Sequence, residues 1–273
     1  MKTILLPVEP YSGIDAAFAV AGLVADRFSA RIDCVTLKPS VVDFIAPDPV
    51  VVVLPQTGYS EGDAMKAARE RFDALSRISH GGESGSAFKW TGQPSIDDAG
   101  LASLSRVYDV TVVGRPGVGR NEPRMTTLEA ALFESGRPVL MSPPVPPKSV
   151  GDNILVHWNA STETARIIFD ALPLLKLAKK VTMLSVEGNM VSGPKPEEML
   201  AYLAAHGIKA TMSHTRPAAK GGAGEAILAE GRKIGADLIL KGAYTQSRLR
   251  QMIFGGATQH ILQAADVPVI LSH

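Results

Sequence analysis

Apolar residues in this chain occur in short runs, and the stretches between those runs have the spacing of amphipathic helices. In the C-terminal half, Ala165, Ile168, Leu172 and Leu175 share one helical face, and Pro173 is expected to kink the last turn of that helix. The predicted strands of this half are residues 154–159, 181–186, 208–212, 238–240 and 267–272, and helices are predicted between them. Alternation of this kind predicts a parallel sheet with helices on both faces.

The N-terminal half repeats this order. Residues 4–9 resemble residues 154–159 at an offset of 150, residues 108–114 match 236–242 at an offset of 128, and residues 137–142 match 267–272 at an offset of 130. Because the three matches come in the same order, we predict an α/β fold of two tandem doubly wound parallel-sheet domains, residues 1–147 and 151–273. The proline-rich residues 143–147 are predicted to be a stiff linker.

One segment of the N-terminal half does not fit the repeat. Residues 40–60 contain the apolar run 50–54, which is expected to pack on the other domain or on a second subunit. A lid over a ligand is the alternative.

Composition limits the function classes. The 28 Lys and Arg residues nearly cancel the 27 Asp and Glu residues, so no bulk charge attracts nucleic acid or an anionic membrane. The single cysteine, Cys34, excludes an internal disulfide and is expected to be a small core residue. No apolar run approaches the roughly 20 residues that span a bilayer. We expect a soluble, cytoplasmic protein.

Two glycine breaks near one strand suggest a ligand site. The strand 238–240 is followed by Gly242, and Gly255 and Gly256 precede the last predicted helix. Glycine lets backbone N–H groups approach a ligand closely, and a helix N-terminus presents unpaired N–H donors that suit a phosphate. The alternative is that these glycines only serve turns and caps.

These segments resemble the universal stress protein family in its tandem-domain form. The resemblance is carried by residues 4–9, by Lys241-Gly-Ala-Tyr, by Phe254-Gly-Gly-Ala-Thr and by residues 267–271, and it covers nearly the whole chain. It implies the adenine nucleotide alpha hydrolase-like fold, with ATP lying across the strand ends and its phosphates at the start of the last helix.

Nucleotide-binding members of that family carry a glycine motif that this chain keeps in part. Gly242 and Gly255 match the first and third glycines, whereas Thr245 replaces the second glycine and Gly256 replaces a hydroxyl residue. Thr258 matches a family position that reaches the phosphates. The resemblance therefore places ATP, with or without Mg²⁺, in the C-terminal domain.

The family pattern also names the residues that we expect to contact the nucleotide. His157, Trp158, Asn159 and Val186 are expected at the adenine and ribose, and Asn159 stands where the family usually has aspartate. The phosphates are expected at Lys241, Gly242, Thr245, Arg248, Arg250, Gly255, Gly256, Ala257 and Thr258. Arg248 and Arg250 fit a solvated basic face equally well.

The N-terminal copy has lost part of the pattern. It keeps Glu9 and Gly114, but residues 125–128 contain no glycine pair, and Leu128 is expected to obstruct the phosphate position. We therefore predict a structural, ligand-poor N-terminal domain. No catalytic constellation and no close metal-ligand spacing is seen among the six histidines.

The leading hypothesis is a stress-response protein that binds an adenine nucleotide and acts as a sensor or regulator, with at most slow hydrolysis. A module that binds a protein partner, with a residual motif, is the alternative. An enzyme related to electron-transfer flavoproteins or nucleotidyl transferases is third, because topology alone favours it. Beyond the nucleotide, the expected partners are a second copy of the chain or an unidentified protein.

The resemblance also predicts how the halves meet, since family members commonly pair through their final strands. Residues 138–142 and 268–272 form an apolar final strand in each half. An exposed edge strand invites pairing because its N–H and C=O groups are unpaired. A linker of roughly ten residues spans at most about 33–36 Å. We expect the final strands to pair antiparallel, so that one chain forms a pseudo-dimer.

Overall fold

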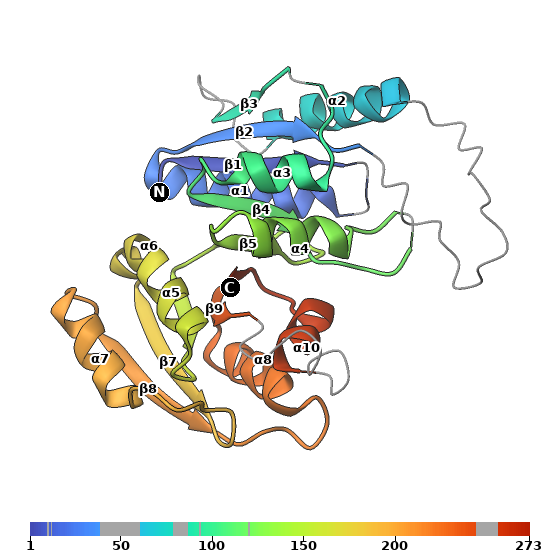
Figure 1. The fold of residues 1–273 in the computed structure, drawn as a ribbon. Coiled ribbons are helices and arrows are strands. Elements are labelled where there is room, and N and C mark those ends of the chain that lie inside the picture. Colours follow the sequence, from blue (N-terminus) through green and yellow to red (C-terminus); the bar gives the residue numbers. More distant parts are fainter. Residues whose placement is uncertain are drawn as a thin grey trace, which may run out of the picture.

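The computed structural model of the chain describes residues 1–9, 11, 13–38, 61–78, 87–92, 94–119, 121–243 and 256–273. The apolar run 50–54 lies outside the described residues, so its predicted packing is not addressed. Figure 1 shows two α/β halves joined through neighbouring strands near the middle of the molecule.

The N-terminal half contains five strands and four helices in its described part. The strands are β1 (Thr3–Val8), β2 (Arg31–Thr36), β3 (Phe88–Trp90), β4 (Val110–Gly114) and β5 (Val139–Ser142). The helices are α1 (Ile14–Phe28), α2 (Glu61–Ile78), α3 (Asp98–Ser105) and α4 (Met125–Glu134).

The C-terminal half follows the same alternation. Its strands are β6 (Asn153–His157), β7 (Lys180–Val186), β8 (Ala210–Thr215), β9 (Leu238–Gly242) and β10 (Val269–Ser272). Its helices are α5 (Thr162–Asp170), α6 (Leu172–Leu177), α7 (Pro196–Ala205), α8 (Gly222–Ile234) and α10 (Ala257–Ala264). The helix with the expected kink at Pro173 is two helices, because Pro173 lacks an N–H and its ring would clash with the carbonyl four residues earlier in a continuous helix.

All ten described strands form one sheet, in the order β3-β2-β1-β4-β5-β10-β9-β6-β7-β8. Neighbouring strands are parallel within each half, whereas β10 and β5 are antiparallel, with Val269 opposite Met141, Ile270 opposite Leu140 and Leu271 opposite Val139. The predicted α/β class and the predicted pairing of the final strands are confirmed. No helix in the described ranges is long and apolar enough to cross a bilayer.

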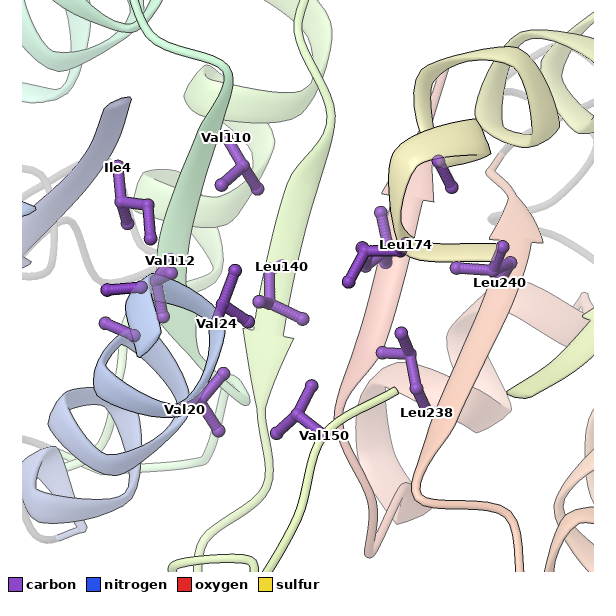
Figure 2. Close-up of a cluster of buried hydrophobic side chains, with 14 of the residues drawn as sticks. Ile4, Val20, Val24, Val110, Val112, Leu140, Val150, Leu174, Leu238 and Leu240 are labelled. Atoms are coloured by element: carbon purple, nitrogen blue, oxygen red, sulfur yellow. The ribbon is translucent and has the colours of Figure 1, made fainter. Parts of the chain in front are cut away.

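The hydrophobic core continues from one half into the other on both faces of the sheet. On one face, a single cluster joins Val20 and Val24 of α1 to Leu140 of β5, and then to Leu174 and Leu238 of the C-terminal half. Figure 2 shows these side chains on both sides of the strand junction, with Val150 between them. On the opposite face, α4, α8 and α10 share a second cluster. The halves therefore pack as one body.

Arg27 of α1 binds residues 150–152, at the end of the segment that links the two halves. Its guanidinium donates to the carbonyls of Val150 at 3.0 Å and Gly151 at 3.1 Å, and it pairs with Asp152 at 2.7 Å. The exposed Lys179 binds the same carboxylate from the C-terminal half at 2.8 Å. The end of the linker is thus anchored by side chains from both sides of the junction.

Continuity of the core predicts one cooperative unfolding transition for the whole chain. Replacing Leu140 by Ala leaves a cavity where the halves meet, and deletions of this kind cost about 2–5 kcal/mol. Thermal unfolding followed by calorimetry should show a single transition at lower temperature. Val107→Ala is the control, because Val107 is 72% exposed. Two separate transitions, with only one shifted by Leu140→Ala, would contradict this account.

Candidate functional site

The predicted site lies where β6, β7 and β9 end and α10 begins. Gly242 is the last residue of β9. Gly256 is the N-cap of α10 and has extended backbone angles, φ −73° and ψ 166°, and no side chain caps this helix. The first N–H groups of α10 therefore face the strand ends without a side-chain acceptor at the cap. Thr245, Arg248, Arg250 and Gly255 lie outside the described residues.

Lys241 is the buried cation of this region. Its side chain is on the same face of β9 as Ile239, which packs in the cluster shared with α8 and α10. The ammonium donates to the Gly242 carbonyl at 2.6 Å and to Thr258 Oγ1 at 2.8 Å. Burial lowers the pKa of Lys241 to about 8, and the Glu163 carboxylate opposes that shift. Strand end and helix start are thus joined by one lysine.

His157 lies on the neighbouring strand β6 and is only 1% exposed. Neither ring nitrogen makes a hydrogen bond of normal geometry within the described ranges. Burial and then the charge of Lys241 lower the pKa of His157, the Asn189 side chain opposes them, and the resulting pKa is about 3. The imidazole is therefore neutral near pH 7, and it places two uncharged polar atoms near the lysine.

Trp158 and Asn159 are occupied by contacts within the protein. The Trp158 side chain packs in the core on the α5 side, and its indole N–H donates to the Pro194 carbonyl at 3.3 Å. Asn159 Oδ1 accepts from Ser161 N at 3.2 Å and from Thr164 Oγ1 at 3.1 Å. Asn159 therefore organises the start of α5, and it is 7% exposed.

Gly242 has a packing reason that does not involve a ligand. A Cβ at this position would lie 2.6 Å from the backbone nitrogen of Thr164 and 2.8 Å from the Cβ of Glu163. A Cβ does not come this close to non-bonded atoms, so the close approach of β9 and α5 requires glycine at residue 242. Gly242 therefore allows the close packing of β9 against α5 and Gly256 is the N-cap of α10, while their expected contacts with a ligand stay predictions.

A hollow of about 650 Å³ lies beside Val186. It is lined by Ser185, Val186, Glu187, Met190, His214, Thr215 and Arg216. Ser185 Oγ and His214 Nδ1 are 2.6 Å apart, because these residues are register partners on β7 and β8. Sequence reasoning named only Val186 here. Aligning the two predicted strands in parallel register would have placed the other lining residues beside Val186.

The N-terminal counterpart is apolar where the C-terminal site is polar. In the β4–β5 register Val113 lies opposite Met141, and in the β9–β10 register Lys241 lies opposite Leu271. Val113 thus corresponds to Lys241, and by the same repeat Leu128 corresponds to Thr258. Both Val113 and Leu128 are buried in one cluster. Leu128 therefore packs in the core, and the expectation that it obstructs a phosphate stays a prediction.

Ion pairs and hydrogen bonds join the side chains at the corresponding place in the N-terminal half. Arg124 pairs with Glu9 and with Asp98, each at 3.1 Å, and Thr127 donates to both carboxylates. The cavity beside them has a volume of about 10 Å³, which is no more than a single water molecule needs. Arg124 thus supplies one positive charge to Glu9, which follows β1, and to Asp98 of α3.

Comparisons with known proteins agree with this architecture. Residues 174–273 match the model of the Universal stress protein family, which confirms the resemblance for the part that holds Lys241 and Thr258. No curated protein sequence matches the chain.

Solved structures extend the likeness to the whole fold. A universal stress protein from Archaeoglobus fulgidus DSM 4304 is 17% identical, with a TM-score of 0.73, and the match covers 99% of this chain and 97% of that one. A candidate universal stress protein from Pseudomonas aeruginosa UCBPP-PA14 is 14% identical, with a TM-score of 0.58 and coverage of 100% and 93%. At these identities the likeness shows the shared fold.

Burial of Lys241 predicts a specific dependence of stability on pH. The native state releases its proton near pH 8, whereas the unfolded chain holds it to about pH 10.4. The unfolded state therefore binds more protons in this window, and the free energy of unfolding gains on the order of 2 kcal/mol by pH 9.5. Urea unfolding of the wild type and of Lys241→Met at pH 7.5 and 9.5 measures the difference.

The exposed Lys176 provides the control for that measurement. Lys176→Met should change with pH as the wild type does, while Lys241→Met should lack the gain. Equal gains in the wild type and Lys241→Met would show that the lysine is not buried as a charge.

Proposed function

We propose that this chain, whose residues 174–273 carry a universal stress protein domain, is a stress-response protein that binds one molecule of ATP in its C-terminal half. The observation that carries the proposal is the buried contact between Lys241 and Thr258 at the start of α10. An ammonium and a helix N-terminus at one place favour a phosphate group. The matching positions of the N-terminal half, Val113 and Leu128, offer neither charge nor hydroxyl.

The phosphates would lie at the start of α10. Gly256 has no side chain to compete for the first N–H groups of the helix, and Ala257 and Thr258 supply the next backbone donors. Lys241 adds a positive charge in a region of low dielectric, where it acts more strongly than at the surface. This assignment rests on residues of the described part alone.

The adenosine part would extend toward Val186. The hollow beside this residue combines the apolar Val186 and Met190 with hydrogen-bonding groups of Ser185 and His214. That mixture suits a purine, which has apolar faces and polar edges. His157 and Asn189 lie between the hollow and Lys241 in our assignment. We propose regulation by bound nucleotide and assign no catalytic residue.

Stoichiometry gives the first test. Calorimetric titration with ATP should saturate at one molecule per chain, because the N-terminal copy is filled by Arg124 and its two carboxylates. Native mass spectrometry should show the same mass increment. Two equivalent sites would contradict the assignment of the N-terminal half, and no uptake at millimolar ATP would reject the proposed function in favour of an interaction module.

The identity of residue 258 gives the second test. Thr258→Leu places at this position the residue that occupies the matching N-terminal position, so it removes the hydroxyl partner of Lys241 and fills space at the helix start. We expect ATP affinity to fall by at least about tenfold, or roughly 1.4 kcal/mol. Leu128→Met is the matched control and should leave affinity unchanged. Unaltered ATP binding in a folded Thr258→Leu protein would exclude this location.

A further inference from the structure

Lys241 carries a buried positive charge that the described part of the fold does not pair with a negative one. The residue is 4% exposed, and the hydrogen bonds that its ammonium donates within the described part of the chain go to neutral oxygens, those of Gly242 and Thr258. No carboxylate forms an ion pair with it among the described residues. An isolated buried charge is costly, so proteins normally pair it or replace it.

The surroundings of the lysine offer no full compensation. His157 of β6 faces it as a neutral imidazole, and Glu163 of α5 acts on it from beyond ion-pair distance. The described part of α10 presents Thr258, and its histidine, His260, pairs with Glu225 of α8. On β10 the register partner is the apolar Leu271. Within the described residues, the region therefore holds a positive charge without an ion-pair partner and a neutral imidazole beside it.

The N-terminal half shows that the same backbone can be built without this charge. Val113 occupies the equivalent strand position and packs against apolar neighbours, with 4% exposure. A valine or methionine at residue 241 would thus satisfy the fold at lower cost. A lysine kept at such a place indicates a task that the stability of the protein does not require.

We infer that Lys241 is the specificity-determining residue of the C-terminal site, which accepts a phosphate-bearing ligand only while this lysine is protonated. The inference rests on the proposed nucleotide site and adds its selectivity and its regulation. The bound anion supplies the countercharge that the protein lacks, and the helix start supplies backbone donors to the same group. Uncharged adenosine makes neither contact, so its binding does not depend on Lys241.

Protonation and binding are then linked. The pKa of Lys241 in the free protein is about 8, and a bound anion raises it. Between pH 7.5 and 9.5 the terminal phosphate of ATP, an ester whose last pKa is near 6, stays ionised. Inorganic tripolyphosphate gains negative charge as the pH rises, which by itself would strengthen its binding and so cannot explain a loss of affinity. The lysine is thus the group in this cluster that changes charge in that window, because His157 is neutral and Glu163 ionised throughout.

Titration calorimetry with three probes tests the inference. ATP, inorganic tripolyphosphate and adenosine are titrated into the wild type, Lys241→Met and Lys176→Met at pH 7.5 and 9.5. For the wild type and Lys176→Met, affinity for ATP and tripolyphosphate should fall by about twentyfold at the higher pH, following the protonated fraction. Lys241→Met should bind both at least about tenfold more weakly at pH 7.5 and show no change with pH.

The probes separate the two proposals. Equal, pH-independent ATP affinity in the wild type and folded Lys241→Met would overturn the role of Lys241 and leave nucleotide binding intact. Tripolyphosphate binding that depends on Lys241, without any preference for ATP, would support the anion site and reject the nucleotide assignment. Binding of none of the probes would reject both. Lys241-dependent adenosine binding would also contradict the inference, because adenosine has no charge to select.

Discussion

The antiparallel pairing of β5 with β10 is the interaction on which the rest of this structure depends. Each half would otherwise end in an apolar strand with unpaired backbone groups, which is a template for aggregation. Pairing buries both edges, makes one sheet of the ten described strands, and allows the core to continue on both faces. Leu140 and Ile270 meet at the centre of this junction. Because the two final strands pair antiparallel, strand positions in one half have equivalent positions in the other, and these can be compared.

That comparison shows similar backbones with different chemistry. At the end of the fourth strand of each half, Val113 and Lys241 have the same register, and the helix that follows carries Leu128 or Thr258. One pair is apolar and completes a core. The other brings a buried charge and a hydroxyl to a helix start. The N-terminal copy also pairs Arg124 with Glu9, which lines its small cavity, and with Asp98. These two carboxylates thus have an ion-pair partner, whereas Lys241 has none among the described residues.

Much of the fold could be predicted from sequence, and less of the site. The family resemblance predicted the pairing of the final strands. The apolar runs and the repeat offsets predicted two parallel-sheet halves, because apolar runs of regular spacing report burial directly. They could not show that Trp158 packs in the core, since a strand tip presents alternate residues to opposite faces. They also missed the contact of Gly242 with α5 and the pairing of Arg124 with Glu9, which join residues distant in sequence. Thr245, Arg248, Arg250 and Gly255 lie outside the described residues and stay predictions.

The central claim is that the two halves share a fold but only the C-terminal one holds a ligand phosphate. A crystal structure of the chain soaked with a non-hydrolysable ATP analogue tests it most directly, because it locates the ligand. The account predicts one analogue per chain, with its phosphates at the start of α10 and within reach of the Lys241 ammonium. A ligand bound beside Glu9 and Arg124, or phosphates lying away from α10 in the C-terminal half, would contradict it.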